Sequence, residues 1–525
     1  MLRDFPIVSL YNIFCTLRRC FDWSGGQTNA NRETGGLLPV SMSPPAGFPI
    51  RPHAAAAADR YCRLFPEATD AAQQQMSVAM LEKLAESMRR KDWSGLQRPR
   101  LGHAPSVVPV TYFGQFVDHD LTLDMTPLRE AGWSKPIHTI NHRTPWLDLD
   151  HLYGDGPCSS RHHHLYESDD ASFRLGYSPY GGEPFDVPFT YDGRLALADS
   201  RNGENIILRQ IHAMFLKLHN VAVRDLPKTL PPRERFDRAR DRVRWQYQWL
   251  VRNWFLLEIC HQEIWDAVFK DGDRRIDWSH DGFAIPVEFS VAAMRFGHSM
   301  VRAKYKLQTG PKVHQLPELF GVQNNRALDP SLKIDWVFFS SSDPTAEANP
   351  IDTTMAGPLF ELPDLHIDLY VRTPVPHPPP SLALRTLARG AAIRLPTGQA
   401  VRDALGEDDI PRTPGGVADD PWGPLRKAGL DGDTPLWYYI LLEAQLGLGL
   451  AAGREATRKR GGFGATLGKV GSRLVAEVIA ASLQEDPTSF VRRHGPDWPG
   501  DPWTTPDGKQ IKVENLAHVA KVVGM

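Results

Sequence analysis

Apolar residues in the middle of the chain repeat at the spacing of α-helices. The segment ENIILRQIHAMFLKLHNVAVRDL has apolar residues at steps of three and four, which places them on one helical face: Ile207, Ile211, Met214, Phe215 and Leu218. Asp199 and Ser200 are candidate N-caps of this helix, and Glu204 falls in its first turn. The same spacing predicts a second long helix over about 233–269, with a break allowed, and a third over about 286–305.

Helical patterns return near the C-terminal end, in PLWYYILLEAQLGLGLA (435–451) and GSRLVAEVIAASLQ (471–484). The segment VRTPVPHPPP (371–380) has too many prolines for a helix or a central strand and predicts an extended connector. Residues 405–435 are polar and rich in Gly, Pro and Asp, which predicts a long surface loop. Strand patterns are few and short. The predicted fold class is therefore mainly α, with one large helical domain and long loops.

The first fifty residues have a different composition from the rest. They are rich in Gly, Asn, Ser and Pro and end in the loop-like SMSPPAGFP, which predicts an extended arm over 1–50 before the domain at 51–525. Residues 5–17 are fairly apolar, but Asp4 precedes them and Arg-Arg-Cys follows where a small-residue cleavage site would lie. We therefore do not expect a secretory signal peptide, which leaves the cytoplasm or export by a non-standard route as the two possible locations.

Composition and charge exclude several functional classes. The 60 Lys and Arg residues balance 62 Asp and Glu, so the basic surplus that a nucleic-acid partner requires is missing. We expect no membrane span, because no run of 18 uncharged apolar residues occurs. The five cysteines are odd in number, sparse and without a CxxC motif, which favours a reduced compartment over a disulfide framework.

The first candidate for chemistry is the segment TYFGQFVDHDLTLD. A helix over 113–121 places Gln115 and His119 four residues apart on one face. Asp118 shares that side, whereas Asp120 points away by about a quarter turn or more. Such a face can bind and deprotonate a small polar substrate. Taken alone, a histidine flanked by acids is more often a salt-bridged or capping residue.

The motif GQFVDHD resembles the distal-helix motif of the animal haem peroxidases, of the peroxidase-cyclooxygenase superfamily. The resemblance implies that His119 is the distal acid–base residue and that Gln115 lines the distal pocket. It also implies that Asp118 can form an ester with a haem methyl group and that Asp120 binds calcium.

The segment ADSRNGEN is similar to the distal arginine segment of the same family. Arg201 then supplies a fixed cation near the peroxide, and Glu204 is the second ester-forming carboxylate. The two residues are three apart, so in a first helical turn they share a face. Asn205 stands where myeloperoxidase has a sulfonium-forming methionine, so we expect no third covalent link.

RTPWLDLDHLYG resembles the calcium loop of the family. The resemblance implies ligands from Thr144 (hydroxyl and carbonyl), the Trp146 carbonyl, Asp148 and Asp150, together with Asp120 from the distal helix. Alternating oxygen ligands suit a hard cation of flexible geometry. Many mammalian members have serine in place of Asp150, so this site would hold three carboxylates. Without the neighbouring motifs, an ordinary acidic turn is the simpler interpretation.

Two further segments complete the resemblance on the proximal side. AAMRFGHSMVR is similar to the proximal motif, with His298 as the iron ligand and Arg295 near a haem propionate. LALRTLARGAAIRLPTGQ resembles the segment whose asparagine hydrogen-bonds the proximal histidine, and Thr386 stands in that place. Threonine is shorter, which leaves the redox strength of the iron open. Arg389 matches a family arginine close to the haem.

The motifs follow the family order and span about residues 60–495. They imply a peroxidase that contains haem b, which Asp118 and Glu204 can hold by ester links, and Ca²⁺. The enzyme would reduce hydrogen peroxide and oxidise a small donor (halide, thiocyanate or phenol) through an oxyferryl haem. The sequence indicates neither the donor nor the oligomeric state.

Three other functions are compatible with parts of the sequence. A fatty-acid dioxygenase of the same fold needs a tyrosine three residues before the proximal histidine, where this chain has Arg295. A haem-binding protein without turnover would need neither His119 nor Arg201. A non-haem metal site at His162, His163 and His164 is not expected, because consecutive residues cannot share one helical face, and we interpret this triplet as a solvated cluster.

Overall fold

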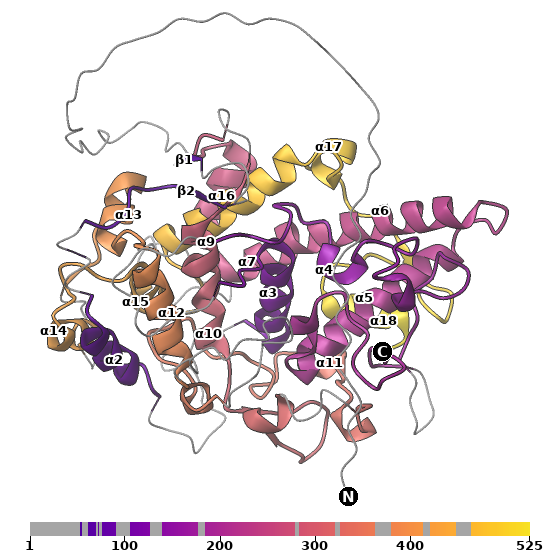
Figure 1. Cartoon of the computed structure of the whole chain (residues 1–525), viewed down its shortest axis with the longest axis horizontal. Coiled ribbons are helices and arrows are strands. Elements are labelled where there is room, and N and C mark those ends of the chain that lie inside the picture. The colour runs from indigo at the N-terminus through magenta and orange to yellow at the C-terminus, as the bar shows by residue number, and fades with distance from the viewer. Residues whose placement is uncertain are drawn as a thin grey trace, which may run out of the picture. The chain divides into compact units, whose positions relative to one another are not determined.

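Helices dominate the computed structural model of this chain (Figure 1). The elements described below belong to one compact unit, Pro44–Met525. The structure describes residues 53–54, 61–69, 72, 76–90, 106–126, 139–176, 184–278, 283–320, 326–362, 380–412, 420–447 and 464–525. The predicted arm at 1–50 and most of the proline-rich connector at 371–380 lie outside these ranges, so those two predictions and the domain boundary remain predictions.

The helix predicted from its apolar face is α5 (Ile206–Arg224), and its predicted caps are wrong. Asn205 caps it, because its side chain accepts a hydrogen bond from the Leu208 backbone N–H at 2.8 Å. Asp199 instead caps a short 3₁₀ helix, η3 (Ser200–Gly203), through the Arg201 backbone N–H. Since this tighter segment takes up the residues before Asn205, the α-helix begins later than the sequence indicates, and Arg201 and Glu204 do not belong to its first turn.

The second predicted helix is present and has the expected break. It starts as α6 (Pro232–Leu250), runs through a π-helical segment η4 (Val251–Phe255) and ends as α7 (Leu256–Ile259). Cys260 is extended, and the chain then continues as α8 (Gln262–Asp266) and a second π-helical segment, η5 (Ala267–Asp271). Single π turns inside helices often mark functional positions.

The third predicted helix, over 286–305, is wrong in its C-terminal part. The chain forms α9 (Val287–Val291), the 3₁₀ helix η6 (Ala293–Phe296) and α10 (Gly297–Met300). It then becomes strand β4 (Lys304–Tyr305), which pairs with β5 (His314–Gln315). The buried Tyr305 hydroxyl accepts hydrogen bonds from the Arg302 backbone N–H at 2.7 Å and from the Tyr112 hydroxyl at 2.9 Å. These tertiary bonds outweigh the local helical pattern.

Further helices cover the remaining chain. They are α2 (Val78–Ser87), α4 (Asp150–Tyr153), η2 (His163–Leu165), η7 (Leu316–Leu319), η8 (Pro330–Leu332), α11 (Trp336–Phe339), η9 (Gly357–Phe360), α12 (Leu382–Ala392), α13 (Gly398–Leu405), α14 (Gly423–Ala428), α15 (Leu436–Leu446), α16 (Lys469–Glu485), α17 (Phe490–His494) and α18 (Leu516–Val523). α14 lies inside the predicted loop over 405–435, so that prediction is wrong there. Trp422 and Leu425 are buried and anchor the helix to the core.

Strands are short in the described part of the chain. β1 (His53–Ala54) pairs antiparallel with β2 (Tyr61–Arg63), which pairs parallel with β3 (Ile285–Pro286). β6 (Trp503–Thr504) and β7 (Gln510–Ile511) form a separate antiparallel pair. The mainly α fold class is confirmed. Among the described residues, no helix is both long and apolar enough to cross a membrane.

One helix, α3 (Val108–Leu121), carries the first candidate motif through the centre of the fold (Figure 1). It packs against α5 on one side and against α10 on another. Every residue of α3 except Gln115 is buried, including Asp118, His119 and Asp120. Three adjacent buried polar side chains need partners within the protein or a ligand, so their surroundings define the candidate site.

Candidate functional site

His119 is buried in the last turn of α3, and its orientation is fixed by an amide. Its Nδ1–H donates to Asn202 Oδ1 at 2.9 Å, while Asn202 Nδ2–H donates to His212 Nδ1 at 3.0 Å. Because the amide nitrogen can only donate, the amide oxygen must accept from His119. This arrangement leaves Nε2 of His119 as a free acceptor. Burial, with the charge of Arg201, lowers the pKa of His119 to about 3 and keeps the ring neutral.

Arg201 lies beside this ring in η3 and is clamped by Asp199. Its Nε and Nη2 donate to Asp199 at 3.1 and 2.7 Å, and Nη2 also donates to the His119 carbonyl at 3.0 Å. Arg143 forms a second ion pair with Asp199. Burial alone would raise the pKa of Asp199, but Arg201 and then Arg143 hold it well below its usual range. Within the described part of the chain, Nη1 of Arg201 has no hydrogen bond and can serve a ligand.

Two carboxyl groups flank the same region. Gln115 Nε2 donates to Glu204 Oε2 at 3.1 Å, and burial raises the pKa of Glu204 to about 7. Asp118 Oδ2 lies 3.5 Å from Arg295 Nη1, and Asp118 Oδ1 accepts from the Thr122 hydroxyl at 3.1 Å. The structure thus gathers side chains from α3, from the loop before α5 and from η6.

His298 lies on α10, which packs against α3. Its Nδ1–H faces Thr386 Oγ1 at 3.4 Å, and the Thr386 hydroxyl donates to the Leu382 carbonyl at 2.9 Å. The threonine oxygen can therefore accept from His298, although the distance makes the bond weak. Burial, with the charge of Arg295, lowers the pKa of His298 to about 3. The Trp437 ring stands edge-on to His298 at 6.0 Å.

Arg389 is held on α12 near the end of α3. Its Nη2 donates to the Thr126 carbonyl at 2.7 Å, and its Nη1 lies 3.4 Å from Asp124 Oδ2. Burial lowers its pKa, and the nearby charge of Arg295 acts in the same direction. Two arginines close enough to repel each other favour an anionic group between or beside them.

His119, which is buried, and His298, which is partly buried, form a donor set that fits haem. His119 and His298 stand on packed helices, and in each the Nδ1 is engaged. Among the described residues, neither Nε2 has a hydrogen-bond partner. A neutral imidazole nitrogen is the usual axial ligand of haem iron, and arginines suit its propionates. Arg295 and Arg389 are the candidates for the second role. Each already lies near one carboxylate, that of Asp118 and that of Asp124 respectively.

A cluster of acids follows directly on the other side of α3. Ligand atoms of Asp120, Asp150 and His151 lie within 4.8 Å of one another, which is close enough to hold one metal ion. His151 Nδ1–H donates to Asp120 Oδ1 at 2.8 Å, whereas Asp120 Oδ2 and His151 Nε2 are buried without a hydrogen bond. Orphaned buried acceptors of this kind are costly unless a cation satisfies them.

The loop before α4 adds oxygen atoms to this cluster. Asp148 accepts from the Thr144 hydroxyl at 2.8 Å and from the Asp150 backbone N–H at 3.1 Å. Burial, in the absence of a metal, raises the pKa of Asp120 and Asp148 to about 7 and that of Asp150 to about 8. The buried Asp120 and the partly buried Asp148 and Asp150 thus all have raised pKa values, which fits a site for a divalent cation. Arg143 Nη1 also donates to Asp150 at 3.1 Å.

Some predicted side chains lie elsewhere or differ from their predicted setting. The Trp146 ring packs on Phe283 at 5.6 Å, and the role of its carbonyl as a calcium ligand stays a prediction. His162 is buried and its Nδ1 accepts from the Asp155 backbone N–H at 3.0 Å, so the prediction of a solvated triplet is wrong for this residue, whereas His163 is exposed.

Sequence reasoning missed two residues of the site. Asn202 orients His119 and stands next to Arg201 in DSRNGEN, so its place beside the predicted arginine was the available signal. His151 contacts Asp120 and follows Asp150 in DLDH. A buried histidine beside a cluster of acids was visible only as a neighbour in sequence.

Residues 124–371 of the chain match the animal haem peroxidase family. The matched stretch contains Arg201, Glu204, Arg295 and His298 and leaves out α3 and α12. No curated protein matches the sequence of the chain.

Three solved structures share the fold at low identity. Peroxidase A from Dictyostelium discoideum is 15% identical with a TM-score of 0.53, over 85% of this chain and 88% of that one. Fatty acid alpha-dioxygenase from Arabidopsis thaliana is 13% identical with a TM-score of 0.58, over 88% and 76%. That from Oryza sativa is 14% identical with a TM-score of 0.57, over 81% and 75%. At these identities the likeness shows the fold alone.

Proposed function

Residues 124–371 of this chain are an animal haem peroxidase domain, and on that premise we propose that the protein is a haem peroxidase. It reduces hydrogen peroxide and oxidises a small donor such as a halide, thiocyanate or a phenol. The observation that carries the proposal is the pairing of a neutral, oriented His119 with the clamped guanidinium of Arg201. A protein that only holds haem has no use for this pair.

Haem b and Ca²⁺ are the cofactors that we propose. His298 would hold the iron through Nε2, while Arg295 and Arg389 would bind the propionates. Asp118 and Glu204 would supply the carboxylates for ester links. When bound, the haem supplies an iron atom that takes up the two oxidising equivalents of the peroxide. The acids around Asp120 would bind the calcium ion and anchor the helix that carries His119.

Two side chains of the protein transfer the proton of hydrogen peroxide and stabilise the charge that develops. His119 accepts a proton at Nε2 from one oxygen of hydrogen peroxide and returns it to the other oxygen, which leaves as water. Arg201 Nη1 stabilises the negative charge that develops on the departing oxygen. Acid–base catalysis of this type contributes about 10²–10⁴-fold and one electrostatic donor about 10²–10³-fold in rate.

Replacing Asn202 by leucine is expected to slow the reaction with hydrogen peroxide by about 10–100-fold, as the loss of an orienting partner typically does. Without the amide oxygen, the His119 ring loses the bond that keeps its Nε2 unprotonated. Stopped-flow absorption measures the rate. Asn202→Asp keeps an acceptor for Nδ1–H and should retain most of it. A leucine variant that binds haem and reacts at the wild-type rate would contradict the orienting role.

Replacing Thr386 by asparagine should give His298 a stronger acceptor than the hydroxyl at 3.4 Å. A gain of about 1 kcal/mol, typical of one hydrogen bond, corresponds to a one-electron potential that is more negative by roughly 40 mV. Thr386→Val removes the acceptor and should shift the potential in the opposite direction. Spectroelectrochemical titration of the two variants checks both signs. Equal potentials would show that Thr386 does not tune the iron.

A second candidate is a fatty-acid dioxygenase, because two of the similar structures have that activity in their names. The position three residues before His298 is Arg295, and its guanidinium lies 3.5 Å from the Asp118 carboxylate. This chain therefore has a cation where the dioxygenase needs a redox-active phenol, which favours the peroxidase.

One experiment separates the candidates. The absorption spectrum of haem-supplemented protein is recorded before and after hydrogen peroxide, and then after iodide or a phenol. Oxygen uptake with a saturated fatty acid is measured in parallel. A Soret band that shifts with peroxide and returns with the donor supports the peroxidase. Oxygen uptake with an unresponsive Soret band supports the dioxygenase, and the absence of a Soret band refutes both.

A further inference from the structure

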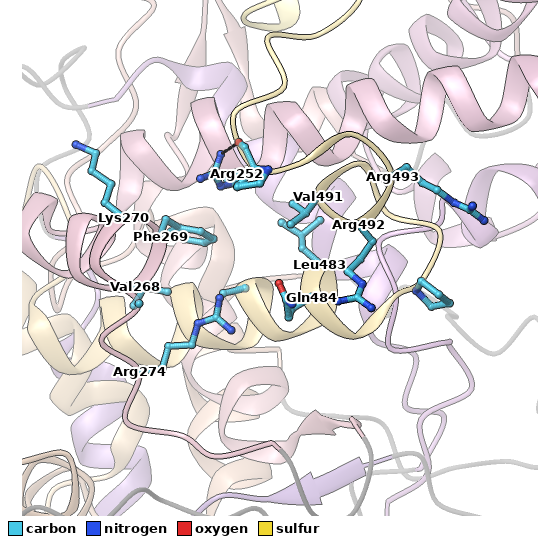
Figure 2. A pocket seen from close by; sticks show the side chains of 14 residues that line it. Arg252, Val268, Phe269, Lys270, Arg274, Leu483, Gln484, Val491, Arg492 and Arg493 are labelled. Atoms are coloured by element: carbon cyan, nitrogen blue, oxygen red, sulfur yellow. Dashed lines mark hydrogen bonds between the residues drawn. The ribbon is translucent and has the colours of Figure 1, made fainter.

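A second group of cations lines a pocket of about 510 Å³ that is separate from the residues above. The pocket lies among η4, η5, α16 and α17 (Figure 2). Its basic lining residues are Arg252, Lys270, Arg274, Arg492 and Arg493. None of the described residues that line it is acidic. The volume is in the range of pockets that bind small molecules, about 300–1,000 Å³.

Arg252 is the most buried of these cations, with 7% of its surface exposed. Its Nη1 donates to the Pro496 carbonyl at 2.8 Å and to Asn253 Oδ1 at 3.1 Å, and its guanidinium stands 5.2 Å from the Phe269 ring centre. These contacts hold the group in place without a carboxylate partner among the described residues. The charge of Asp497 acts on this guanidinium without forming an ion pair, so the hydrogen-bond partners of this buried cation are neutral and it can still bind an anion.

The other lining arginines also keep donors available, although the nearby carboxylates of Glu477 and Glu485 act on the charge of Arg274. Arg274 has a buried Nε without a hydrogen bond, and neither it nor the exposed Arg492 and Arg493 forms an ion pair with any residue that the structure describes. Lys270 differs, because its Nζ lies 2.7 Å from Asp266. In the view of Figure 2, Gln484 is drawn between Arg274 and Arg492.

Part of the remaining lining is apolar, and the local backbone is unusual. Val268, Phe269, Leu483 and Val491 contribute carbon surface. Arg252 belongs to the π-helical η4, and Phe269 belongs to the π-helical η5. Both π turns of the second long helix thus face one pocket. Because π turns cost regular helical bonds and recur at functional positions, their coincidence here indicates a ligand site.

We propose that this pocket binds a small phosphate ester with an apolar body. The guanidinium groups of Arg274, Arg492 and Arg252 would bind the phosphate oxygens, and the body would lie against Phe269 and Leu483. A guanidinium group presents several N–H donors, which match the acceptor oxygens of a phosphate dianion. Three guanidinium groups offer more donors than the two oxygens of one carboxylate can accept. The proposal does not depend on the peroxidase activity.

Isothermal titration of the full-length protein with phenyl phosphate tests the proposal, with inorganic phosphate and citrate as comparison anions at constant ionic strength. We expect one saturable site for phenyl phosphate, with weaker binding of inorganic phosphate because it lacks the ring. Affinity should fall at least tenfold in Arg274→Gln and in Arg492→Gln. No saturable binding would overturn the proposal, and tighter binding of citrate would overturn the phosphate class.

A matched control keeps the test specific. Arg238 on α6 is exposed and pairs with Glu234, and it does not line the pocket. Arg238→Gln removes the same charge and should bind phenyl phosphate like the wild type. If Arg238→Gln weakened the binding of phenyl phosphate as much as the pocket variants do, the effect would be one of general charge and the proposed site would be refuted. Arg492 is exposed, so its glutamine variant should melt at the wild-type temperature and report binding alone.

Discussion

Replacement of His119 by leucine is expected to lower the rate constant for the reaction with hydrogen peroxide by about 10²–10⁴-fold, the usual contribution of a positioned acid–base group. The imidazole is neutral, buried and oriented by Asn202, and its Nε2 is free near Arg201. Leucine fills a similar volume, so α3 should keep its packing. His298 is untouched, and the haem should still bind.

Stopped-flow absorption at the Soret band measures this rate over a series of peroxide concentrations. His142 is exposed and lies outside the site, so His142→Leu is the matched control and should react like the wild type. The Soret band and the haem content of His119→Leu should equal those of the wild type. A leucine variant with full haem content and an unchanged rate would show that His119 is not the acid–base residue.

The amide of Asn202, which orients His119, allows a double-mutant test of the same role. Since Asn202 acts only through the ring that it holds, its loss should have no further effect once His119 is gone. His119→Leu and the double variant with Asn202→Leu are therefore expected to react at the same rate, because residues that act as one unit are not additive. Additive losses would mean that Asn202 has an independent role.

Local patterns were sufficient for the helices that bury one clear face. The spacing of Ile207, Ile211 and Leu218 predicts α5, but the predicted caps placed its start too early. The same reasoning fails after Met300, where the local pattern still favours a helix. There the buried hydroxyl of Tyr305 and the pairing of β4 with β5 decide the conformation. The Tyr112 hydroxyl that donates to Tyr305 comes from 193 residues away, so periodicity does not register it.

The residues of the site that lie within the sequence motifs could be predicted. GQFVDHD places Gln115 and His119 on one face of a helix, and α3 has that geometry. The roles of these residues came from the family resemblance, because spacing alone left a salt-bridged histidine as the simpler interpretation.

The contacts that tune the site could not be predicted from spacing. Asn202 reaches His119 from 83 residues away, and Arg295 reaches Asp118 from η6. Burial is the other missing quantity. The low pKa of His119 and the high pKa values around Asp120 arise mainly from desolvation, which depends on the complete fold.

Loading the chelator-treated protein with Ca²⁺ is expected to raise its free energy of unfolding by about 4 kcal/mol when calcium exceeds its dissociation constant a thousandfold. The reason is the cost of the empty cluster. Asp120, Asp148 and Asp150 are brought together in the core, and Asp120 Oδ2 has no hydrogen bond. A divalent ion would satisfy these oxygens and remove their repulsion. Thermal unfolding at a series of calcium concentrations measures the gain.

The pH dependence of the metal-free protein provides an independent readout with a defined sign. In the unfolded chain these carboxyl groups lose their protons near pH 4, whereas in the fold the pKa is about 7 for Asp120 and Asp148 and about 8 for Asp150. Between these values the folded state binds more protons, so stability should fall as the pH rises from about 4 to 8. Bound calcium keeps the carboxylates ionised and should abolish this decline, with release of protons on binding.

The identity of the metal ion can be tested, because His151 contacts Asp120 and could be a ligand itself. Calcium prefers oxygen ligands, whereas an imidazole nitrogen favours zinc or another transition metal. Asp150→Ser removes one carboxylate and should weaken calcium binding, while Asp170→Asn, an exposed position, should not change it. His151→Gln should leave calcium binding nearly intact, because the oxygen donors of all five predicted ligand residues remain. Zinc that binds more tightly than calcium and is lost in His151→Gln would refute the calcium assignment and make His151 a ligand.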